Sequence, residues 1–346
     1  MIRPPPAVPK VCTRIVAVCR CSLSLSVRRR LYARVLCRAV MGILKVLPRN
    51  ARKRWRDVSL RDVAREAVVS GREAMSAANV NEHMNKLSTV LNWGIREDLC
   101  LTNPAKGLRL PQVQSAKDRR RAFNGDQLLR IFDAPLYRGC VDDERGYAVT
   151  GDQRPRRSRF WVPLLGLFAG LRLNEACQLL IDDIRDDRGV LCIHISADGD
   201  AKVLKTAASS RVVPVHPELI AIGLSDYVEL ARSTGQVRLF DEIKLDSFGM
   251  HSGRFSRWFA RFLVTCGAAA PRTCFHSFRH SFRDALRNGG VEREVALALG
   301  GWTTPSGFAT VGDAYGSGFD PRVLLKEVEK VRYPDLDLTH LRQVKA

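Results

Sequence analysis

The first 56 residues contain no aspartate or glutamate, and the first carboxylate of the chain is Asp57. The same stretch holds fifteen of the 56 lysine and arginine residues, so most of the formal net charge of +20 comes from it. The remaining 290 residues carry 41 basic and 36 acidic side chains and are only mildly basic. A large positive charge favours a polyanionic partner. Because most of the positive charge lies in one terminal segment, net charge alone does not identify nucleic acid as the partner. Sequence motifs must provide that evidence.

The ten cysteines include no CxxC pair and no Cys/His cluster at zinc spacing, and Cys19 and Cys21 come nearest to one. This scatter predicts reduced thiols in a cytosol and no structural zinc site. No apolar run approaches the roughly 20 residues of a membrane span, so no membrane partner is expected. The acid-free, arginine-rich N-terminus also fits an import signal. Arg14 and Arg20 interrupt any secretory apolar stretch, so an import signal is the less favoured interpretation of this segment.

The segment 1–56 shows no sustained helical or strand period and is expected to be a disordered basic tail of unclear origin. It could contact phosphates, or it could be an upstream extension or the remnant of a truncated gene.

From Val58 onward the pattern is helical. Apolar side chains recur there at three- and four-residue spacing, which predicts one amphipathic helix: Val80, Met84, Leu87, Leu91 and Ile95. The helix should end before Asn103-Pro104, and the polar stretch 114–121 predicts a linker.

Beyond the linker, we expect a helix at about 124–133, an apolar helix in WVPLLGLFAG, a turn at Gly170 and a helix capped by Asn174. The β-branched runs VLCIHIS, VLKT and RVVPV predict a small antiparallel meander. The rest is helical apart from a glycine-rich break at 300–318. The predicted fold class is therefore mainly α with a small antiparallel β-sheet (α+β), in two lobes joined by a basic linker.

Four sequence segments contain residues that could act together in catalysis. They are Arg172 in GLRLNEACQL, Lys205 in VLKTAASSRVVPV, His276 and Arg279 in RTCFHSFRHSF, and Trp302 and Tyr315 in LGGWTTPSGFATVGDAYGSG. Each patch alone has an ordinary structural explanation, such as a helix-end charge, a solvated lysine or a packed tyrosine. Because the pKa of a phenol is near 10, a tyrosine acts as a nucleophile only beside cations and a base.

The order Arg, Lys, HxxR, Trp, Tyr over about 145 residues resembles the catalytic domain of the tyrosine recombinases, the phage integrase family. The resemblance covers residues 119–346. Residues 57–113, with their LNWG and NPAKGL elements, resemble the later part of the family's helical, SAM-like core-binding domain. The expected organisation is a tail at 1–56, a partial core-binding domain at 57–113, a linker at 114–121 and a catalytic domain at 122–346. Since only about 55 recognisable residues precede the linker, an N-terminal truncation is expected.

The resemblance implies a site-specific recombinase that breaks and rejoins DNA through a 3′-phosphotyrosine, without cofactor, ATP or metal. The residue matches follow the motifs. Arg172 and Arg279 match the phosphate-clamping arginines, and His276 matches the histidine that binds the phosphate and manages the tyrosine proton. Lys205 matches the lysine that protonates the leaving 5′ oxygen, Trp302 matches a donor to a phosphate oxygen, and Tyr315 matches the nucleophile.

The same resemblance implies the partners and setting of the protein. The substrate is double-stranded DNA that carries an attachment site, bound by a homotetramer, with DNA-bending accessory proteins as further partners. The expected location is the cytosol or nucleoid of a bacterium, and the expected source is a phage or another mobile genetic element.

Several residues remain open alternatives or supporting members of the site. Glu175 matches an acidic residue that supports the first arginine region. HSFRHSFR is a tandem repeat in which His280 fits the trailing histidine of the family's HxxRH pattern, and Arg283 is expected to be structural. Lys202 competes with Lys205 for the role of acid. Tyr333 is the rival nucleophile, although Pro334 beside it suits a chain turn better.

Two other functions stay open. A catalytically idle, DNA-binding integrase remnant would keep these motifs after truncation, and a type IB topoisomerase shares the chemistry without programmed strand exchange. A metal-dependent nuclease is disfavoured because the sequence presents no Asp/Glu/His arrangement suited to Mg²⁺.

Overall fold

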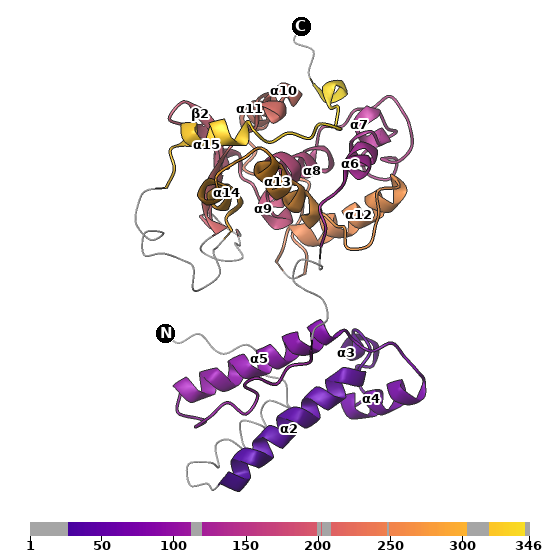
Figure 1. The fold of residues 1–346 in the computed structure, drawn as a ribbon. Coiled ribbons are helices and arrows are strands. Elements are labelled where there is room, and N and C mark those ends of the chain that lie inside the picture. The colour runs from indigo at the N-terminus through magenta and orange to yellow at the C-terminus, as the bar shows by residue number, and fades with distance from the viewer. Residues whose placement is uncertain are drawn as a thin grey trace. The chain divides into compact units, whose positions relative to one another are not determined.

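The computed structural model describes residues 27–111, 120–198, 202, 209–247, 249–302 and 318–342. The chain divides into two compact units, unit 1 over residues 1–115 and unit 2 over residues 116–346 (Figure 1). No helix in the described ranges is both long and apolar enough to cross a membrane.

The regular elements in the described part of unit 1 are all helices. Its elements are α2 (Val27–Val46), α3 (Ala51–Arg54), α4 (Leu60–Val69) and α5 (Ala77–Arg96). Helix α5 is the amphipathic helix that the sequence predicts, and Val80, Met84 and Leu91 on it are fully buried. It begins after Ser76, whose hydroxyl accepts a hydrogen bond from the Asn79 N–H.

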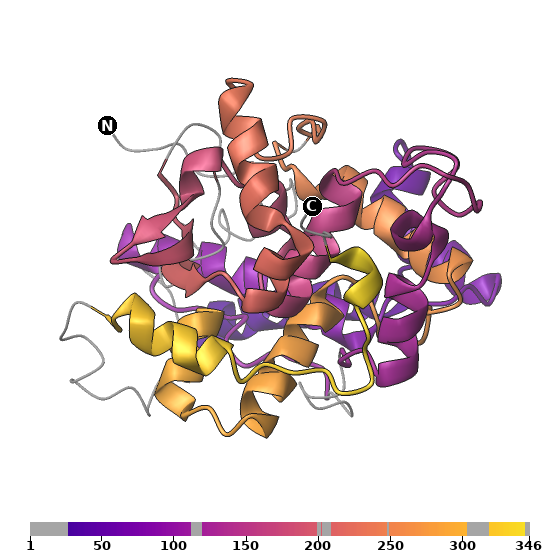
Figure 2. The ribbon, with the colours of Figure 1, turned by 90° about the horizontal axis from the view of Figure 1, so that it is seen from above.

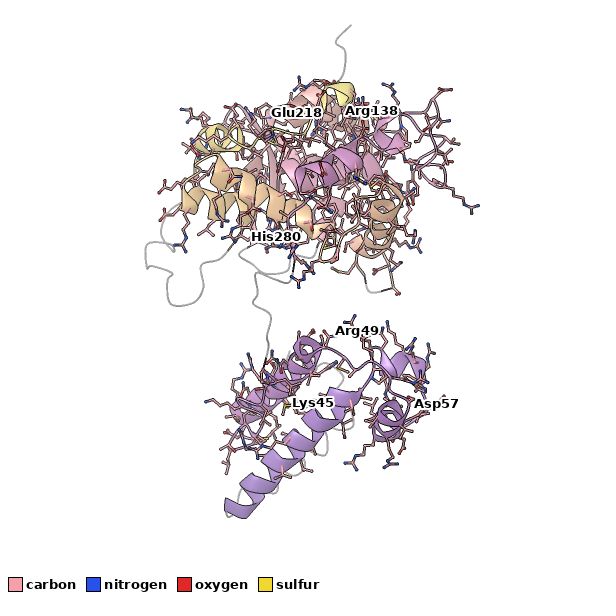
Figure 3. All side chains as sticks on the ribbon, turned by 45° about the vertical axis from the view of Figure 1, so that its right-hand side comes forward. Lys45, Arg49, Asp57, Arg138, Glu218 and His280 are labelled. Carbon is pink, nitrogen blue, oxygen red and sulfur yellow. The ribbon has the colours of Figure 1, made fainter. Side chains whose placement is uncertain are left out.

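The structure corrects the expectation of a disordered tail for residues 27–56, because α2 belongs to the core of unit 1. Cys37 on α2 is completely buried and joins the same apolar cluster as Val80 and Leu91 of α5. Arg34 donates to the carbonyl groups of Pro104 at 3.2 Å and Lys106 at 3.1 Å, which ties α2 to the chain that follows α5. The part of this segment before residue 27 lies outside the described residues. Figure 3 labels Lys45 in the last turn of α2, and Arg49 and Asp57 in the chain between α2 and α4.

Unit 2 is mainly helical with one sheet. Its helices before the sheet are α6 (Gly125–Phe132), α7 (Pro135–Arg138), α8 (Ser158–Phe168), α9 (Leu173–Cys177) and the 3-10 turn η3 (Ile181–Asp183). After the sheet come α10 (Pro217–Ile222), α11 (Leu224–Ser233), α12 (Ser252–Thr265), α13 (His276–Asn288), α14 (Arg293–Gly300), α15 (Pro321–Val328) and the 3-10 turn η6 (Thr339–Leu341).

The sheet is a three-stranded antiparallel meander in the order β1 (Ile184–Asp187), β2 (Val190–Ile195), β3 (Arg211–Pro214). This confirms the predicted fold class of mainly α with a small antiparallel sheet. The first strand, β1, was not predicted, because its sequence IRDD is mostly polar and three of its four residues are not buried. The run VLKT, expected as a strand, lies outside the described residues. Helix α15 packs against β2 and β3, as Figure 2 shows from above.

The core of unit 2 forms where α8 packs against α13. Every residue of α8 except Arg159 is buried, which explains its unbroken apolar sequence. Gly166 lets the two helices approach closely, because a Cβ there would lie 2.9 Å from the ring of Phe275. Phe278 of α13 is fully buried and makes an edge contact with Phe123 at a centroid distance of 4.8 Å. This contact region fixes α13 beside the turn that follows α8.

The turn after α8 also differs from the sequence expectation. The N-cap of α9 is Arg172, whose extended backbone precedes the helix, and Asn174 lies inside the first turn. The side chain of Asn174 donates to Gln178 at 2.8 Å and accepts from the Ser252 N–H at 3.2 Å. Asn174 therefore connects α9 to the start of α12 and does not cap α9.

The packing of α2 yields a stability prediction for unit 1. Leu47, just after α2, is 2% exposed, whereas Val35 on α2 is 54% exposed. Leu47→Ala should lower the free energy of unfolding of unit 1 by about 2–5 kcal/mol because it leaves a cavity. Val35→Ala should change it by less than about 0.5 kcal/mol. Equilibrium denaturation of both variants checks this, and equal stabilities would contradict a folded segment 27–56.

Candidate active site

Arg172 and Glu175 form an ion pair at the start of α9. Arg172 Nη1 donates to Glu175 Oε1 at 2.5 Å and to Ser209 Oγ at 3.2 Å. The carboxylate also accepts the Arg172 backbone N–H at 2.9 Å, so it caps α9 while it holds the arginine side chain. The side chain of Arg172 is 21% exposed, whereas that of Glu175 is 4% exposed. The carboxylate is thus enclosed, and the arginine reaches solvent.

A second arginine, Arg211 at the start of β3, reaches the same carboxylate. Its Nη2 donates to Glu175 Oε2 at 2.8 Å, and its Nη1 donates to the carbonyl of Ser209 at 2.9 Å. The Arg211 side chain is 4% exposed. In the sequence, Arg211 is only the first residue of the run RVVPV, which predicts a strand. Its partners lie 36 residues away in Glu175 and 88 residues away in Leu299, which local sequence does not reveal.

Arg279 lies on α13 and is 2% exposed. Its Nη1 donates to the carbonyl of Gly170 at 2.6 Å, and its Nη2 donates to the carbonyl of Gly300. A guanidinium has more N–H groups than these two bonds use, so Arg279 keeps donors for a ligand. Because α8 and α13 pack together, the turn at Gly170 and the arginine of α13 meet.

The C-terminal end of α14 joins all three arginines. The carbonyl of Leu299 accepts from Arg211 Nε at 2.9 Å, that of Gly300 accepts from Arg279, and that of Gly301 accepts from Arg172 Nη2 at 3.2 Å. The last carbonyl groups of a helix lack partners within the helix and carry the negative end of its dipole. Three consecutive carbonyl groups therefore each bind a different guanidinium.

The glycines at these junctions are required by geometry. Gly170 has φ +61, and a Cβ there would lie 2.3 Å from the ring of Phe282. Gly301 has φ +53 and ends α14 in the left-handed conformation, which glycine adopts readily. A Cβ at Gly300 would overlap the ring of Trp302 at 1.9 Å. The LGGW sequence thus turns the chain so that these carbonyl groups and Trp302 face the arginines.

The charges of this cluster do not balance. Burial would raise the pKa of Glu175, but Arg211 and Arg172 outweigh burial and lower it to about 2, so the carboxylate is ionised. Burial, then the charges of Arg211 and Arg172, lower the pKa of Arg279 to about 9, which leaves it protonated at neutral pH. The cluster thus holds three guanidinium groups and one carboxylate, which pairs with Arg172 and Arg211. The excess positive charge favours a bound anion, and the partly exposed Arg172 shows where one would enter.

His276 and His280 lie one turn apart on α13, with a ring-centroid distance of 5.2 Å. Burial lowers the pKa of His276 to about 4, and the positive charges of Arg120, Arg279 and Arg172 contribute. His276 is therefore neutral at pH 7. Burial also lowers the pKa of His280, against the opposing effect of Asp284. Both imidazoles are half-buried, and Figure 3 labels His280.

Two arginines of α13 lie over the ring of Trp302. The guanidinium carbon of Arg279 lies 4.6 Å from the ring centroid, and that of Arg283 lies 4.9 Å from it. Arg283 of the second HxxR motif thus packs on the tryptophan. This contact agrees with the structural role expected for Arg283 and leaves Arg279 as the arginine that joins the cluster.

The structure brings together five of the eight residues predicted for the site or its support: Arg172, Glu175, His276, Arg279 and Trp302. His280 lies beside His276. Lys205 and Tyr315 lie outside the described residues. Their roles therefore rest on the sequence.

Two alternatives for these roles do lie in the described part. Lys202 Nζ pairs with Asp183 Oδ1 at 2.6 Å, and both side chains are less than a tenth exposed. The hydroxyl of Tyr333 donates to the carbonyl of Leu167 at 2.8 Å, and burial raises its pKa well above the usual value. The Tyr333 phenol is thus a poor nucleophile in this state.

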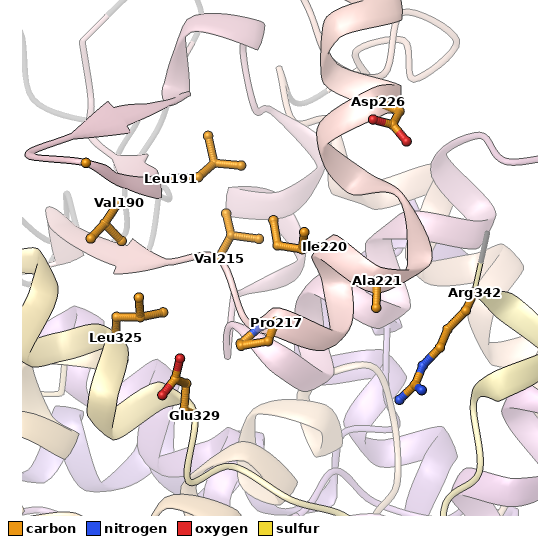
Figure 4. Close-up of a pocket in the computed structure, with 11 residues that line it drawn as sticks. Val190, Leu191, Val215, Pro217, Ile220, Ala221, Asp226, Leu325, Glu329 and Arg342 are labelled. Atoms are coloured by element: carbon orange, nitrogen blue, oxygen red, sulfur yellow. The ribbon is translucent and has the colours of Figure 1, made fainter. Parts of the chain in front are cut away.

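An apolar cavity of about 640 Å³ lies elsewhere on unit 2 (Figure 4). It opens between β2, α10 and α15 and is lined mainly by Val190, Leu191, Val215, Ile220 and Leu325. None of the predicted site residues lines it. This cavity is therefore separate from the predicted site.

Three arginines, a neutral histidine and an indole around helix-end carbonyl groups define an anion-binding site suited to phosphoryl transfer. The comparisons agree with this class. Residues 152–309 match the model of the phage integrase family. This part of the chain is thus similar to the phage integrase family. The matched range includes the arginine cluster and ends before Tyr315.

Curated relatives point the same way. Tyrosine recombinase XerC of Mycobacterium sp. strain KMS is 26% identical over 226 residues, which cover 63% of this chain and 66% of the relative. XerC of strain JLS gives the same values. The chain thus spans slightly less than two thirds of the length of these relatives.

Solved structures with a similar chain path include three integrases. The integrase from mycobacterium phage Brujita has a TM-score of 0.39 and 18% identity, with 96% of this chain and 97% of that chain covered. The Tn1549 transposon integrase in complex with transposon right end DNA has a TM-score of 0.47 and 17% identity, with 85% and 91% covered. A lambda integrase tetramer bound to a Holliday junction has a TM-score of 0.46 and 18% identity, with 87% and 79% covered.

The enclosed carboxylate yields a prediction for pH dependence. Because the folded pKa of Glu175 is about 2 and its ordinary value is 4.5, its ionised form stabilises the fold above pH 4.5. This contribution, about 3 kcal/mol, should be lost as the pH falls from 4.5 toward 2. Glu175→Gln should lower the free energy of unfolding at pH 7 by about 3–5 kcal/mol, because Arg172 and Arg211 lose their carboxylate. It should also make the free energy of unfolding less dependent on pH between about pH 4.5 and pH 2.

Glu229→Gln is the matched control, because Glu229 pairs with Arg232 at the surface and is 69% exposed. Its cost should stay below about 1 kcal/mol. Chemical denaturation from pH 3 to 7 measures both variants. An unchanged pH dependence in Glu175→Gln would show that the carboxylate does not hold the arginines.

Proposed function

We propose that this protein is a DNA strand transferase that cleaves and rejoins DNA through a 3′-phosphotyrosine on Tyr315, acting as a site-specific recombinase. The observation that carries the proposal is the convergence of Arg172, Arg211 and Arg279 on the end of α14, within the range that matches the integrase family. Such a cluster suits a phosphodiester, whose cleavage develops negative charge on non-bridging oxygens.

The chemistry assigns one task to each group. The Tyr315 oxygen attacks phosphorus, the bond from phosphorus to the 5′ oxygen breaks, and a 3′-phosphotyrosine forms. His276, neutral at pH 7, accepts the tyrosine proton, and an approaching phosphate would raise its pKa toward that task. Lys205 donates a proton to the departing 5′ oxygen. Attack by the 5′ hydroxyl of another strand reverses the step and joins the strands.

The remaining groups bind the phosphate. Arg172 and Arg279 bind its non-bridging oxygens, since an arginine can present two parallel donors to one phosphate. The indole N–H of Trp302 adds a donor. Arg211 holds Glu175 and the carbonyl of Leu299 and acts through Arg172, because the two arginines share the carboxylate. In this arrangement Arg211 is a positioning residue.

The domain organisation follows from the same proposal. Unit 2 performs the chemistry, and the helices of unit 1 form a core-binding domain that begins within α2, earlier than the sequence predicts. The partner is double-stranded DNA with an attachment site. The Tn1549 integrase and the lambda integrase are described in complexes with DNA, the latter as a tetramer on a Holliday junction. We extend this to a homotetramer of the present chain on DNA, aided by DNA-bending proteins, in a bacterial cytosol.

Tyr315→Phe should abolish covalent attachment to DNA and leave DNA affinity nearly unchanged. The substitution removes only the phenolic oxygen, so packing and charge hardly change, but the nucleophile is lost. The measurement is a denaturing gel after incubation with a suicide substrate that carries the attachment site. An adduct that persists in Tyr315→Phe would overturn the assignment. Binding without any adduct in the wild-type protein would favour the catalytically idle remnant.

Cleavage should not depend on divalent metal, because arginine and lysine side chains supply the charge compensation in this mechanism. EDTA should therefore change the initial rate of adduct formation by less than about twofold, against the about 10²-fold loss expected when an essential electrostatic group is removed. The measurement is the rate with EDTA and with Mg²⁺. Activity that vanishes with EDTA and returns with Mg²⁺ would contradict the mechanism.

A further inference from the structure

The chain that enters the described part of unit 2 lies along the start of α13. The backbone N–H of Arg121 donates to the carbonyl of Arg272 at 3.2 Å, and that of Phe123 donates to Ser281 Oγ at 3.1 Å. The first acceptor precedes α13, and the second lies in its second turn. Arg120, the residue before the first of these bonds, is therefore held near the turns of α13 that carry the two histidines.

The positive charge of Arg120 acts on both of these histidines. Burial is the largest cause of the lowered pKa of His276, and the charge of Arg120 comes next, ahead of that of Arg279. Burial also lowers the pKa of His280, and Arg120 adds to this effect against the opposing charge of Asp284. The Arg120 side chain is exposed, and no carboxylate in the described ranges forms an ion pair with it. An accessible cation therefore lies beside the imidazole to which we assign the tyrosine proton.

The positive charge continues into a cavity of about 660 Å³ beside α6 and the start of α13. Arg121, Arg130 and Arg272 line it, and Asp126 is the only carboxylate among its described lining residues. Arg130 Nη1 donates to the carbonyl of Gly267 at 3.3 Å, which ties α6 to the loop after α12. Three guanidinium groups against one carboxylate leave an excess of positive charge, so this cavity favours an anion.

A DNA strand has the repeating negative charge that this arrangement suits. Each strand carries one phosphate for about every 3.4 Å of helix axis, so further phosphates flank the one that reacts. A strand that leaves the arginine cluster past His276 meets Arg120 first and the cavity at Arg121 next. Arginine suits such contacts because a guanidinium can present two parallel donors to one phosphate, and contacts to backbone phosphates fix the register of a protein on DNA.

We propose that Arg120 and Arg121 bind backbone phosphates of the cleaved DNA strand next to the phosphate that reacts, with Arg120 at the nearer position and Arg121 at the one beyond it. This inference rests on the proposed function and adds two DNA-binding residues to the same site. Both side chains hold the strand in register and take no part in bond breaking.

Neutral linkages test these contacts one phosphate at a time. A methylphosphonate replaces one charged phosphate oxygen by a methyl group, so each duplex in a set can lack a single charge near the scissile phosphate. An alanine variant should lose affinity for ordinary DNA, but it should lose nothing more where its own phosphate is already neutral. A general loss of structure would instead weaken binding to every duplex. Affinity is measured for the full chain by fluorescence anisotropy.

Arg120→Ala should bind ordinary attachment-site DNA about tenfold more weakly than wild type, and its plot of log affinity against log salt should be shallower by about 0.9. On the duplex whose nearer flanking phosphate is neutral, it should bind within about twofold of wild type. Arg121→Ala should show the same pattern with the linkage one position further from the scissile phosphate. Arg120→Lys keeps the charge and should stay within about threefold of wild type on ordinary DNA.

Arg138→Ala is the matched control, because Arg138 is also an exposed arginine of unit 2, and Figure 3 shows it on the opposite side of that unit from His280. It should match wild type on every duplex and keep the same salt dependence. Wild-type affinity of Arg120→Ala for ordinary DNA, or a defect of the same size on every duplex, would overturn the proposal.

Adduct formation by the wild-type protein on a suicide form of the ordinary duplex separates this inference from the proposed function. An adduct without any coupling between arginine and neutral linkage would refute the flanking contacts alone. Coupling without an adduct would refute the strand-transfer function and leave the phosphate contacts standing. A wild-type protein that neither binds nor reacts with the DNA would contradict both.

Discussion

The carbonyl groups of residues 299–301 hold the arginines of the site in place, and the rest of the active region depends on this contact. A helix C-terminus leaves its last carbonyl groups unpaired and negative, and here Arg211, Arg279 and Arg172 satisfy them one by one. These arginines come from β3, α13 and the start of α9. A single helix end thus brings three distant parts of the chain to one point and sets the spacing of their guanidinium groups.

The fold supplies what this contact needs. Close packing of α8 on α13 places the Gly170 carbonyl beside Arg279, and the left-handed turn at Gly301 directs the end of α14 toward the cluster. Glu175 neutralises only part of the positive charge, so the arginines are held firmly while the site still attracts an anion. Such an arrangement holds its donors in place before any ligand binds, and preorganised electrostatic sites of this kind stabilise a transition state in the reaction that we propose.

Much of this site could be predicted from sequence, because Arg172, the HxxR motif and Trp302 occur in a recognisable order, and the helices α5, α8 and α13 have clear patterns. Arg211 could not be recognised as a member, since its contacts are long-range. Helix α2 was missed because its buried residues, including Ala33 and Cys37, are small and surrounded by arginine. Strand β1 is polar and too short for a clear alternation. Tertiary contacts therefore decide the elements whose local sequence is weakly patterned.

In the proposed function, the arginine cluster activates one particular tyrosine. The most direct test is to trap the protein on a suicide DNA substrate, digest the adduct with trypsin and map the phosphotyrosyl peptide by mass spectrometry. The two candidate tyrosines lie in different tryptic peptides, so the experiment can distinguish them. Tyr315 lies in the peptide 294–322, and Tyr333 lies in the peptide 333–342. We predict that the nucleotide remnant is found on Tyr315 in the first peptide. A remnant on Tyr333, or on any residue outside 294–322, would contradict the account.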